Sequence, residues 1–186
     1  MLSCGEESAA LTFDHLGTAC PESAASSSLA GIAADEREHE RLLNGLRSSL
    51  PQPAEDRFLD AAMRRFFMRL AHRDVAVHLV RIVAIDSAMC RILGELRSSN
   101  RPLAADPWVT AILERIHRDE ARHVAIASRC ARPLLKAVRG REIALDAREQ
   151  LIEVLRLRGD SFDSLGVEPD ELFARLRALP RSAQES

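Results

Sequence analysis

The chain lacks several residue types and patterns that would mark particular classes of protein. Tyrosine does not occur among its 186 residues, so a mechanism that stores a radical on tyrosine is excluded. No stretch of 18 apolar residues exists, because His78 and Arg81 interrupt the best candidate, and no membrane span is expected. The first residues show no basic region followed by an apolar core, so we expect no secretion signal.

Cysteine and lysine are also scarce. The four cysteines stand far apart, form no C-x-x-C pair and are interpreted as reduced thiols of a cytoplasmic protein. They are Cys4, Cys20, Cys90 and Cys130. Lys136 is the only lysine, so arginine carries nearly all the positive charge. The net charge of -2 gives no electrostatic case for a nucleic acid or an anionic membrane as partner.

Signals of β-strands are missing too, which predicts an all-α protein. The chain shows neither apolar alternation nor N-G or D-G hairpin turns, while Ala, Leu, Arg and Glu dominate. Asp106 and Pro107 form a good N-cap and first-turn pair for one of the helices. Core helices are predicted over residues 6–16, 27–46, 75–97 and 108–133, a crossover helix over 54–71, and two further helices over 141–158 and 168–179.

These helices predict one domain with an appendage. Residues 1–135 are expected to form a four-helix bundle with its crossover helix, and residues 136–180 to form C-terminal helices that pack on the bundle near its short first helix. The segment at 158–166 is interpreted as a solvated turn, and residues 181–186 as a disordered tail. With 46% hydrophobic and 29% charged residues, the composition is that of a soluble globular protein.

One motif occurs twice. The pattern D-E-x-x-H stands at residues 35–39 and again at 119–123, each time on a predicted core helix. Glu and His three residues apart project from the same face of a helix, so both can bind one metal, or the Glu can bridge two. Chance alone predicts roughly 0.5 single E-x-x-H matches in such a chain, but below about 0.001 for two copies that each follow an Asp.

The residues that flank the motif place it on the buried faces of its helices. Glu36 has Leu29, Ile32, Ala33 and Leu43 at helical spacing. Glu120 has Leu113, Ile116, Val124 and Ala127. An unpaired carboxylate on such a face would be costly, so metal binding by Glu36, His39, Glu120 and His123 is the simplest explanation.

A site for two metals in a four-helix bundle also needs one carboxylate from each of the other two helices. Asp86 lies at the centre of the most apolar helix face, and it stands level with Glu120 because their midpoint, residue 103, falls in the loop between the two helices. On the first helix, Glu6 shares its face with apolar residues, whereas Glu7 shares its face with Asp14. We therefore predict Asp86 and Glu6 as ligands, with Glu7 as the alternative to Glu6.

The Asp that begins each motif has a predicted role as well. A histidine that binds a metal needs an acceptor for its other ring nitrogen, which fixes its tautomer and orientation. Asp35 lies about 100° around the helix from Glu36, so it points toward a neighbouring helix rather than toward its own ligand pair. We predict a crossed arrangement in which Asp35 bonds His123 and Asp119 bonds His39; the alternative is that both aspartates are solvated.

The doubled motif resembles that of the ferritin-like di-iron carboxylate proteins. This superfamily includes bacterioferritins, rubrerythrins, ribonucleotide reductase small subunits, acyl-carrier desaturases, tRNA hydroxylases and multicomponent monooxygenases. The residues DEARH at 119–123 match the D-E-x-R-H form of the oxygen-activating members, whereas DEREH at 35–39 has Glu38 where that form has Arg. The resemblance covers roughly residues 1–135 and implies a ferritin-like four-helix bundle.

Several members of the superfamily do not fit. The absence of tyrosine argues against a radical-storing reductase subunit, and the absence of C-x-x-C pairs against a rubrerythrin with its rubredoxin module. A haem-binding bacterioferritin is expected to have Met after the Glu of the second helix, where this chain has Arg37. An ordinary ferritin centre carries E-x-x-H only once. A small oxygen- or peroxide-activating enzyme remains.

The resemblance implies a non-haem di-iron oxidase or oxygenase that uses O2 or peroxide on a small organic substrate, as in biosynthetic tailoring. Glu36 and Glu120 would bridge two irons, His39 and His123 would each bind one, and Glu6 and Asp86 would be terminal ligands. Manganese in one or both positions, an external electron donor and a homodimer are compatible with it. The alternatives are a ferritin-like protein that oxidises iron or scavenges peroxide, and a metal-free helical interaction protein.

The remaining histidines have weaker claims. His117 lies three residues before Glu120 on the same side of the helix, so it is a candidate extra ligand, with a histidine at the helix edge as the alternative. His15, His72 and His78 are interpreted as surface or linker residues.

Overall fold

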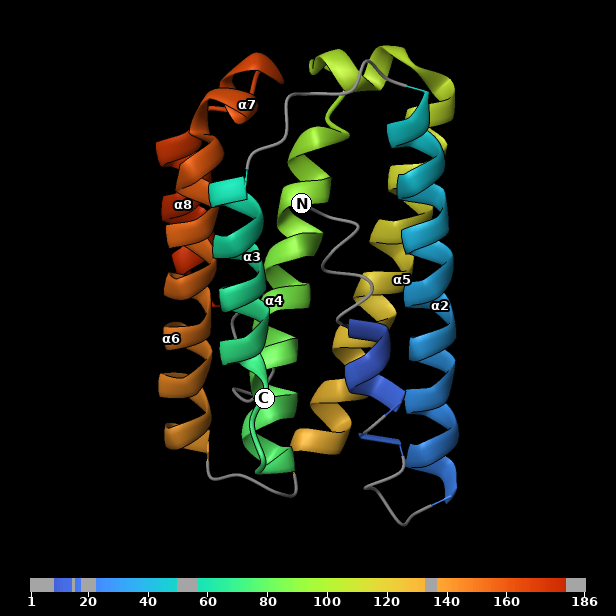
Figure 1. Ribbon diagram of the computed structural model, residues 1–186, viewed down its shortest axis with the longest axis vertical. Coiled ribbons are helices and arrows are strands. Elements are labelled where there is room, and N and C mark those ends of the chain that lie inside the picture. Colours follow the sequence, from blue (N-terminus) through green and yellow to red (C-terminus); the bar gives the residue numbers. More distant parts are fainter. Residues whose placement is uncertain (1–8, 15, 18–22, 50–56, 133–136, 180–186) are drawn as a thin grey trace, which may run out of the picture.

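The computed structural model describes residues 9–14, 16–17, 23–49, 57–132 and 137–179, and within these ranges every regular element is a helix. Long helices run side by side along the longest axis of the molecule (Figure 1). The prediction of an all-α chain is therefore confirmed over the part of the chain that the structure describes.

Three long helices form the half of the molecule that carries the doubled motif. Helix α5 (Pro107–Ala131) packs against both α2 (Ser23–Ser48) and α4 (Val75–Leu96). Helix α6 (Ala137–Leu155) packs against α4, and α3 (Arg57–Leu70) contacts α6 and α4. In Figure 1, α6 and α3 lie to one side of α4, while α5 and α2 lie to the other.

Aspartates fix where two of these helices begin. Asp74 precedes α4, and its Oδ1 accepts hydrogen bonds from the backbone N–H groups of Ala76 at 2.9 Å and Val77 at 3.3 Å. Asp106 does the same for Trp108 at 2.9 Å and for the residue after it at 3.1 Å, with Pro107 in the first turn. Each cap satisfies backbone donors that the helix leaves without an internal partner. The predicted Asp-Pro start of α5 is confirmed.

The apolar interior consists of two clusters. The larger lies among α3, α4, α5 and the C-terminal helices. The smaller joins Phe13 and Leu16, from the helical segment near the start of the chain, to Leu29 and Ile32 of α2 and to residues of α4 and α5. The first predicted helix thus packs on the motif-bearing helices, while Glu6 and Glu7 lie outside the described residues.

The C-terminal helices do not lie where we expected them. Helices α6 and α8 (Pro169–Arg177) belong to the larger cluster with α3 and α4, whereas the first helical segment belongs to the smaller one. In Figure 1 the two groups stand on opposite sides of α4. Over the described part of the first helix, the expectation that the C-terminal helices cover it is therefore wrong, because α4 has two apolar faces and the C-terminal helices occupy the other one.

The segment predicted to be a solvated turn is also different. Residues Gly159–Ser164 form helix α7, whose Phe162 is buried edge-to-face against Phe173 of α8 with ring centroids 6.0 Å apart. Gly166 follows with a φ of 74°, a left-handed conformation that favours glycine. The chain can then turn back, so that the backbone N–H of Val167 donates to the Phe162 carbonyl at 2.9 Å.

A completely buried arginine joins the C-terminal helices to α4. Arg148 of α6 has no exposed surface. Its guanidinium donates to the Ala84 carbonyl at 3.2 Å and the Ser87 hydroxyl at 2.6 Å on α4. It also donates to the carbonyls of Leu176 at 2.7 Å and Ala178 at 2.6 Å, at the end of α8. Burial lowers the pKa of Arg148 to about 10, with Arg91 as a smaller cause.

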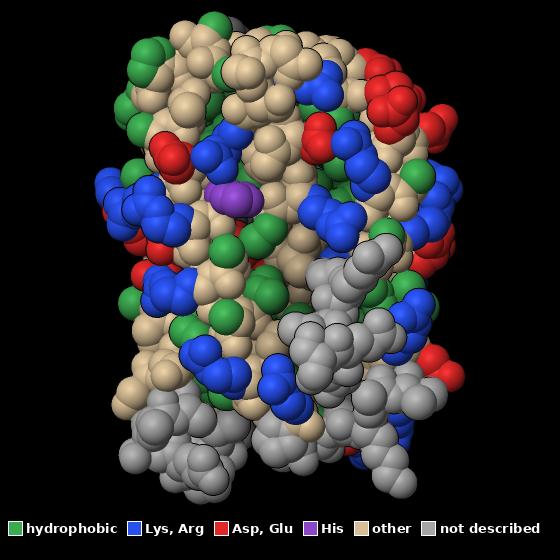
Figure 2. All heavy atoms as spheres, turned by 180° about the vertical axis from the view of Figure 1, so that it is seen from behind, with side chains coloured by type: hydrophobic (Ala, Val, Ile, Leu, Met, Phe, Trp, Pro, Cys, Tyr) green, Lys and Arg blue, Asp and Glu red, His purple; other side chains and the backbone are tan. Residues whose placement is uncertain are grey.

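None of the described helices is both long enough and apolar enough to cross a membrane. Seen from behind, arginine side chains are spread over the surface between small hydrophobic areas (Figure 2).

His72 is exposed as expected, and His15 lies outside the described residues. His78 is buried at 7% exposure, so its interpretation as a surface residue is wrong: α4 is enclosed on this face as well.

Candidate metal centre

The two copies of the motif meet in the interior between α2 and α5. Glu36 and His39 project from α2, and Glu120 and His123 from α5. All four side chains are buried, with exposures of 1%, 0%, 4% and 0% in the same order. Each Glu–His pair spans one helical turn, which explains why both members of a pair point inward. The prediction that the two motifs lie on core-facing stripes is confirmed.

The Glu36 carboxylate lies between the two histidines. Its Oε1 is 2.9 Å from His123 Nδ1, and its Oε2 is 3.4 Å from His39 Nδ1. Glu120 Oε1 is 3.8 Å from the same His39 Nδ1, and the two imidazole rings have centroids 5.8 Å apart. Ligand atoms of Glu36, His39 and Glu120 all lie within 4.8 Å of one another. This buried group could therefore hold a metal ion.

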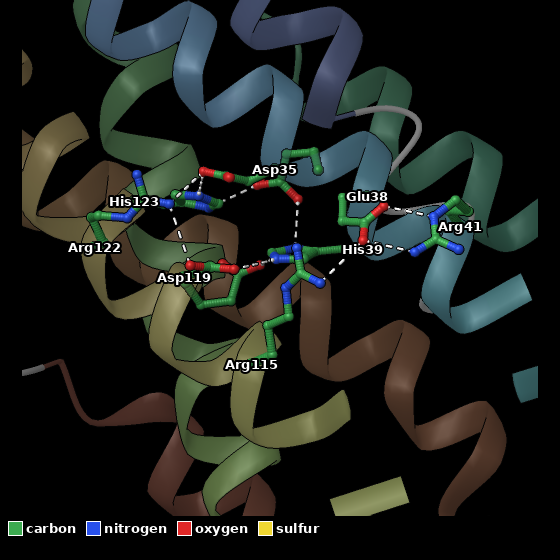
Figure 3. Close-up of polar contacts among 10 residues, drawn as sticks. Asp35, Glu38, His39, Arg41, Arg115, Asp119, Arg122 and His123 are labelled. Atoms are coloured by element: carbon green, nitrogen blue, oxygen red, sulfur yellow. Dashed lines mark hydrogen bonds and ion pairs between the residues drawn. The ribbon is translucent and has the colours of Figure 1, made fainter. Parts of the chain in front are cut away.

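The outer nitrogens of the two histidines contact aspartates of the opposite helix. His39 Nε2 is 3.2 Å from Asp119 Oδ2, and His123 Nε2 is 3.1 Å from Asp35 Oδ2. The predicted crossed pairing is thus present, and Figure 3 shows Asp119 beside His39 and Asp35 beside His123. Asp35 and Asp119 are partly exposed, with side-chain exposures of 29% and 20%.

The contacts of the outer nitrogens (Nε2) with the aspartates determine what the inner nitrogens (Nδ1) of His39 and His123 can bind. A carboxylate only accepts hydrogen bonds, so each Nε2 carries the proton that it donates to its aspartate. A neutral histidine then presents the lone pair of Nδ1 toward the glutamate oxygens, which are also electron-rich. Such a contact at 2.9 Å, as between His123 and Glu36, is favourable only with a cation between the atoms, either a second proton or a metal ion.

Arg122 completes the polar layer outside the histidines. Its Nη2 donates to Asp35 Oδ2 at 2.5 Å and to Asp119 Oδ1 at 3.3 Å. Burial alone raises the pKa of Asp119, but hydrogen bonds from His39 and Arg122, together with their positive charge, outweigh it and lower that pKa. The pKa of Arg122 is raised, first by its hydrogen bond to Asp35. Asp119 is therefore held as a hydrogen-bond acceptor.

Glu38, which stands where the second motif has Arg122, belongs to a separate set of surface ion pairs. It accepts hydrogen bonds from Arg41 Nε at 2.6 Å and from Arg115 Nη1 at 3.1 Å. The hydrogen bond from Arg41 is the main reason that the pKa of Glu38 falls to about 2; burial opposes this fall, and the charges of both arginines assist it. Arg115 thereby ties α5 to α2 through Glu38 (Figure 3).

The other predicted ligands have different outcomes. Asp86 is buried at 9% exposure on α4, as its apolar surroundings predicted, but it is not part of the compact group formed by Glu36, His39 and Glu120. Its charge contributes, after burial, to raising the pKa of the Cys90 thiol to about 11. The role of Asp86 as a ligand stays a prediction. Glu6 lies outside the described residues.

His117 contacts Arg97 at the edge of α5. Its Nδ1 lies 3.0 Å from Arg97 Nη1, which can only donate, so this nitrogen accepts a hydrogen bond at the half-buried edge of α5. Burial, followed by the charge of Arg97, lowers the pKa of His117. The compact group of ligand atoms does not include it, and the alternative of a histidine at the helix edge describes its position.

Comparison with family models, with curated proteins and with solved structures gives no match for this chain.

Arg122 is part of the motif DEARH, but the motif alone did not indicate a role for it. The contact with Asp119 could have been predicted from the spacing, because Arg122 lies three residues after Asp119 and hence on the same side of α5. Its reach to Asp35 on α2 depends on how the two helices are packed, which the motif alone does not give.

Proposed function

We propose that the chain holds two metal ions between α2 and α5 and is a non-haem di-iron oxidase or oxygenase acting on a small organic substrate. The observation that carries this proposal is the orientation of the two histidines. Both turn Nδ1 toward buried glutamates while an aspartate of the opposite helix accepts from Nε2. An acceptor on the outer nitrogen is the arrangement that metal-binding histidines need.

In this proposal the carboxylates of Glu36 and Glu120 and the inner nitrogens of His39 and His123 would hold the ions. Asp86 of α4 and Glu6 are the further carboxylates expected in a ferritin-like bundle, with the segment before Gly17 as the first helix and α2, α4 and α5 as the others. Mixed nitrogen and oxygen ligands suit iron or manganese. When bound, iron in such a site supplies the redox chemistry that activates O2, for which an external electron donor would be required.

The chain's own residues prepare the centre for this chemistry. The Asp35 and Asp119 carboxylates keep protons on the outer nitrogens of His123 and His39, so the inner nitrogens remain available as ligands. Burial of both glutamates removes water from around their carboxylates, which strengthens their attraction for a cation. Phe13 of the smaller apolar cluster lies beside His123, with ring centroids 6.4 Å apart, and limits the access of solvent there.

The test is anaerobic titration of purified protein with Fe(II), followed by addition of oxygen and an optical spectrum. We expect two Fe(II) per chain and a new absorption band after oxygen is added. Glu36→Gln should bind Fe(II) at least about 10-fold more weakly, because the neutral amide removes the charge that lies between both histidines. Glu40→Gln, one turn further along α2, is the matched control and should bind as the unchanged protein does.

The proposal fails if the unchanged protein binds neither Fe(II) nor Mn(II) stoichiometrically, or if Glu36→Gln binds either ion as tightly. Oxygen uptake that stops when the added Fe(II) is oxidised, with reductant present and no organic compound consumed from a panel, would support instead the iron-oxidising alternative.

A further inference from the structure

Arg122 is the one described residue that the structure shows in contact with both aspartates of the centre. Its side chain is half exposed at 49%, yet a single nitrogen, Nη2, reaches Asp35 on α2 and Asp119 on its own helix. Each of these aspartates in turn contacts the outer nitrogen of one histidine. The chain of contacts therefore runs from His123 through Asp35, Arg122 and Asp119 to His39, across both halves of the centre (Figure 3).

The two copies of the motif contribute unequally to this chain of contacts. The position of Arg122 in the second copy is held by Glu38 in the first. Glu38 bonds Arg41 and Arg115 and contacts neither aspartate. A second arginine at this position would allow each half to hold its own aspartate. Because the first copy has an acid there, one guanidinium from α5 serves both halves.

Electrostatics explains why this one cation matters. Asp35 and Asp119 approach the same guanidinium nitrogen, so their like charges are close to each other and repel. Arg122 offsets that repulsion and fixes the direction of both carboxylates. Since the carboxylates orient the imidazole rings, loss of Arg122 loosens two ligands on two different helices at the same time.

We propose that Arg122 is a positioning residue that orients both histidines together and thereby couples the loading of the two metal positions. This inference rests on the proposed metal centre. When one ion orders its histidine, the shared arginine and the opposite aspartate are ordered too, so less conformational freedom remains to be lost when the second ion binds. Binding of two Fe(II) should therefore be positively cooperative in the unchanged protein.

The metal titration compares Arg122→Gln with Arg115→Gln. Arg115 is a matched control because it lies on the same helix, is exposed to the same degree at 50%, and also makes an ion pair across to α2, but with Glu38 instead of an aspartate. Arg122→Gln should weaken Fe(II) binding at both positions by roughly 10- to 100-fold and abolish the cooperativity, while Arg115→Gln should retain both.

A second readout needs no metal. In the metal-free protein, each outer Nε2 proton is held by an aspartate, so proton NMR should show two slowly exchanging imidazole signals. Both should exchange faster in Arg122→Gln and neither in Arg115→Gln. Arg122→Lys should restore much of the loss, because one nitrogen makes both contacts and a lysine provides one charged nitrogen.

The outcomes separate this proposal from the metal centre itself. If the unchanged protein binds no metal, the proposed function is wrong. If it binds two ions, but Arg122→Gln shows unchanged affinity, cooperativity and exchange, the centre stands and the role of Arg122 is refuted. A loss confined to one histidine signal or one metal position would also overturn it, because a shared residue must act on both.

Discussion

Replacing Arg148 by methionine tests whether the buried guanidinium fixes the C-terminal helices to the motif-bearing half of the molecule. Methionine has a similar length and no charge, so it keeps much of the packing and removes the four hydrogen bonds to α4 and the end of α8. The perturbation therefore isolates the polar contribution of a side chain with no exposed surface.

The expected magnitude follows from what becomes of each acceptor. The Ser87 hydroxyl still donates to the Ala84 carbonyl at 3.1 Å, and the exposed Ala178 can turn its carbonyl to water. The Leu176 carbonyl is buried and loses the Arg148 donor, at a cost of roughly 1–3 kcal/mol. Hydrogen bonds from a charged donor contribute roughly 1.5–3 kcal/mol each, but removal of a buried charge also regains several kcal/mol of desolvation. We expect a net loss of about 2–3 kcal/mol in the free energy of unfolding.

Urea unfolding followed by circular dichroism is the assay. The midpoint should fall by roughly 1 M if the slope is about 2–3 kcal/mol/M, with an unchanged slope. In a thermal scan the same change lowers Tm by roughly 4–12 °C. Arg141→Met is the control, because Arg141 is exposed on the same helix and should change stability by less than about 0.5 kcal/mol. Equal stabilities of the two variants would refute the reasoning, and a more stable Arg148→Met would show that desolvation outweighs the hydrogen bonds.

Two further predictions concern α7 and Asp119 of the candidate metal centre. Phe162→Ala should cost about 3–5 kcal/mol of unfolding free energy, because the ring is buried against Phe173, whereas Phe58→Ala, with Phe58 68% exposed, should cost less than about 0.5 kcal/mol. Urea midpoints check this pair, and similar losses would show that α7 does not pack as described. Asp119→Asn should weaken Fe(II) binding by roughly 10- to 100-fold with the helical spectrum unchanged, because the amide is a poorer acceptor for His39. A calorimetric titration measures that change, and an unaltered affinity contradicts the role given to Asp119.

Local features of the sequence were sufficient for much of the fold. Helical periodicity predicted the long helices, because the side chains of one turn lie above those of the next whatever surrounds them. The start of α5 at Asp106 and Pro107 was readable, since a cap involves only its own first turn. The same regularity placed Glu36 with His39, and Glu120 with His123, on inward faces. Even the crossed pairing with Asp35 and Asp119 followed from the angle between neighbouring residues of a helix.

Other features depend on which helix packs against which, and a single helix does not contain that information. Arg148 appears in the sequence as one more arginine on an amphipathic helix, and only the approach of α4 and α8 encloses it. His78 is buried because both sides of α4 are covered. Phe162 stabilises a short helix only because Phe173 is there to meet it. Arg122 reaches two aspartates because α2 and α5 lie at one particular separation, and contacts between helices are set by packing, not by the period along either chain.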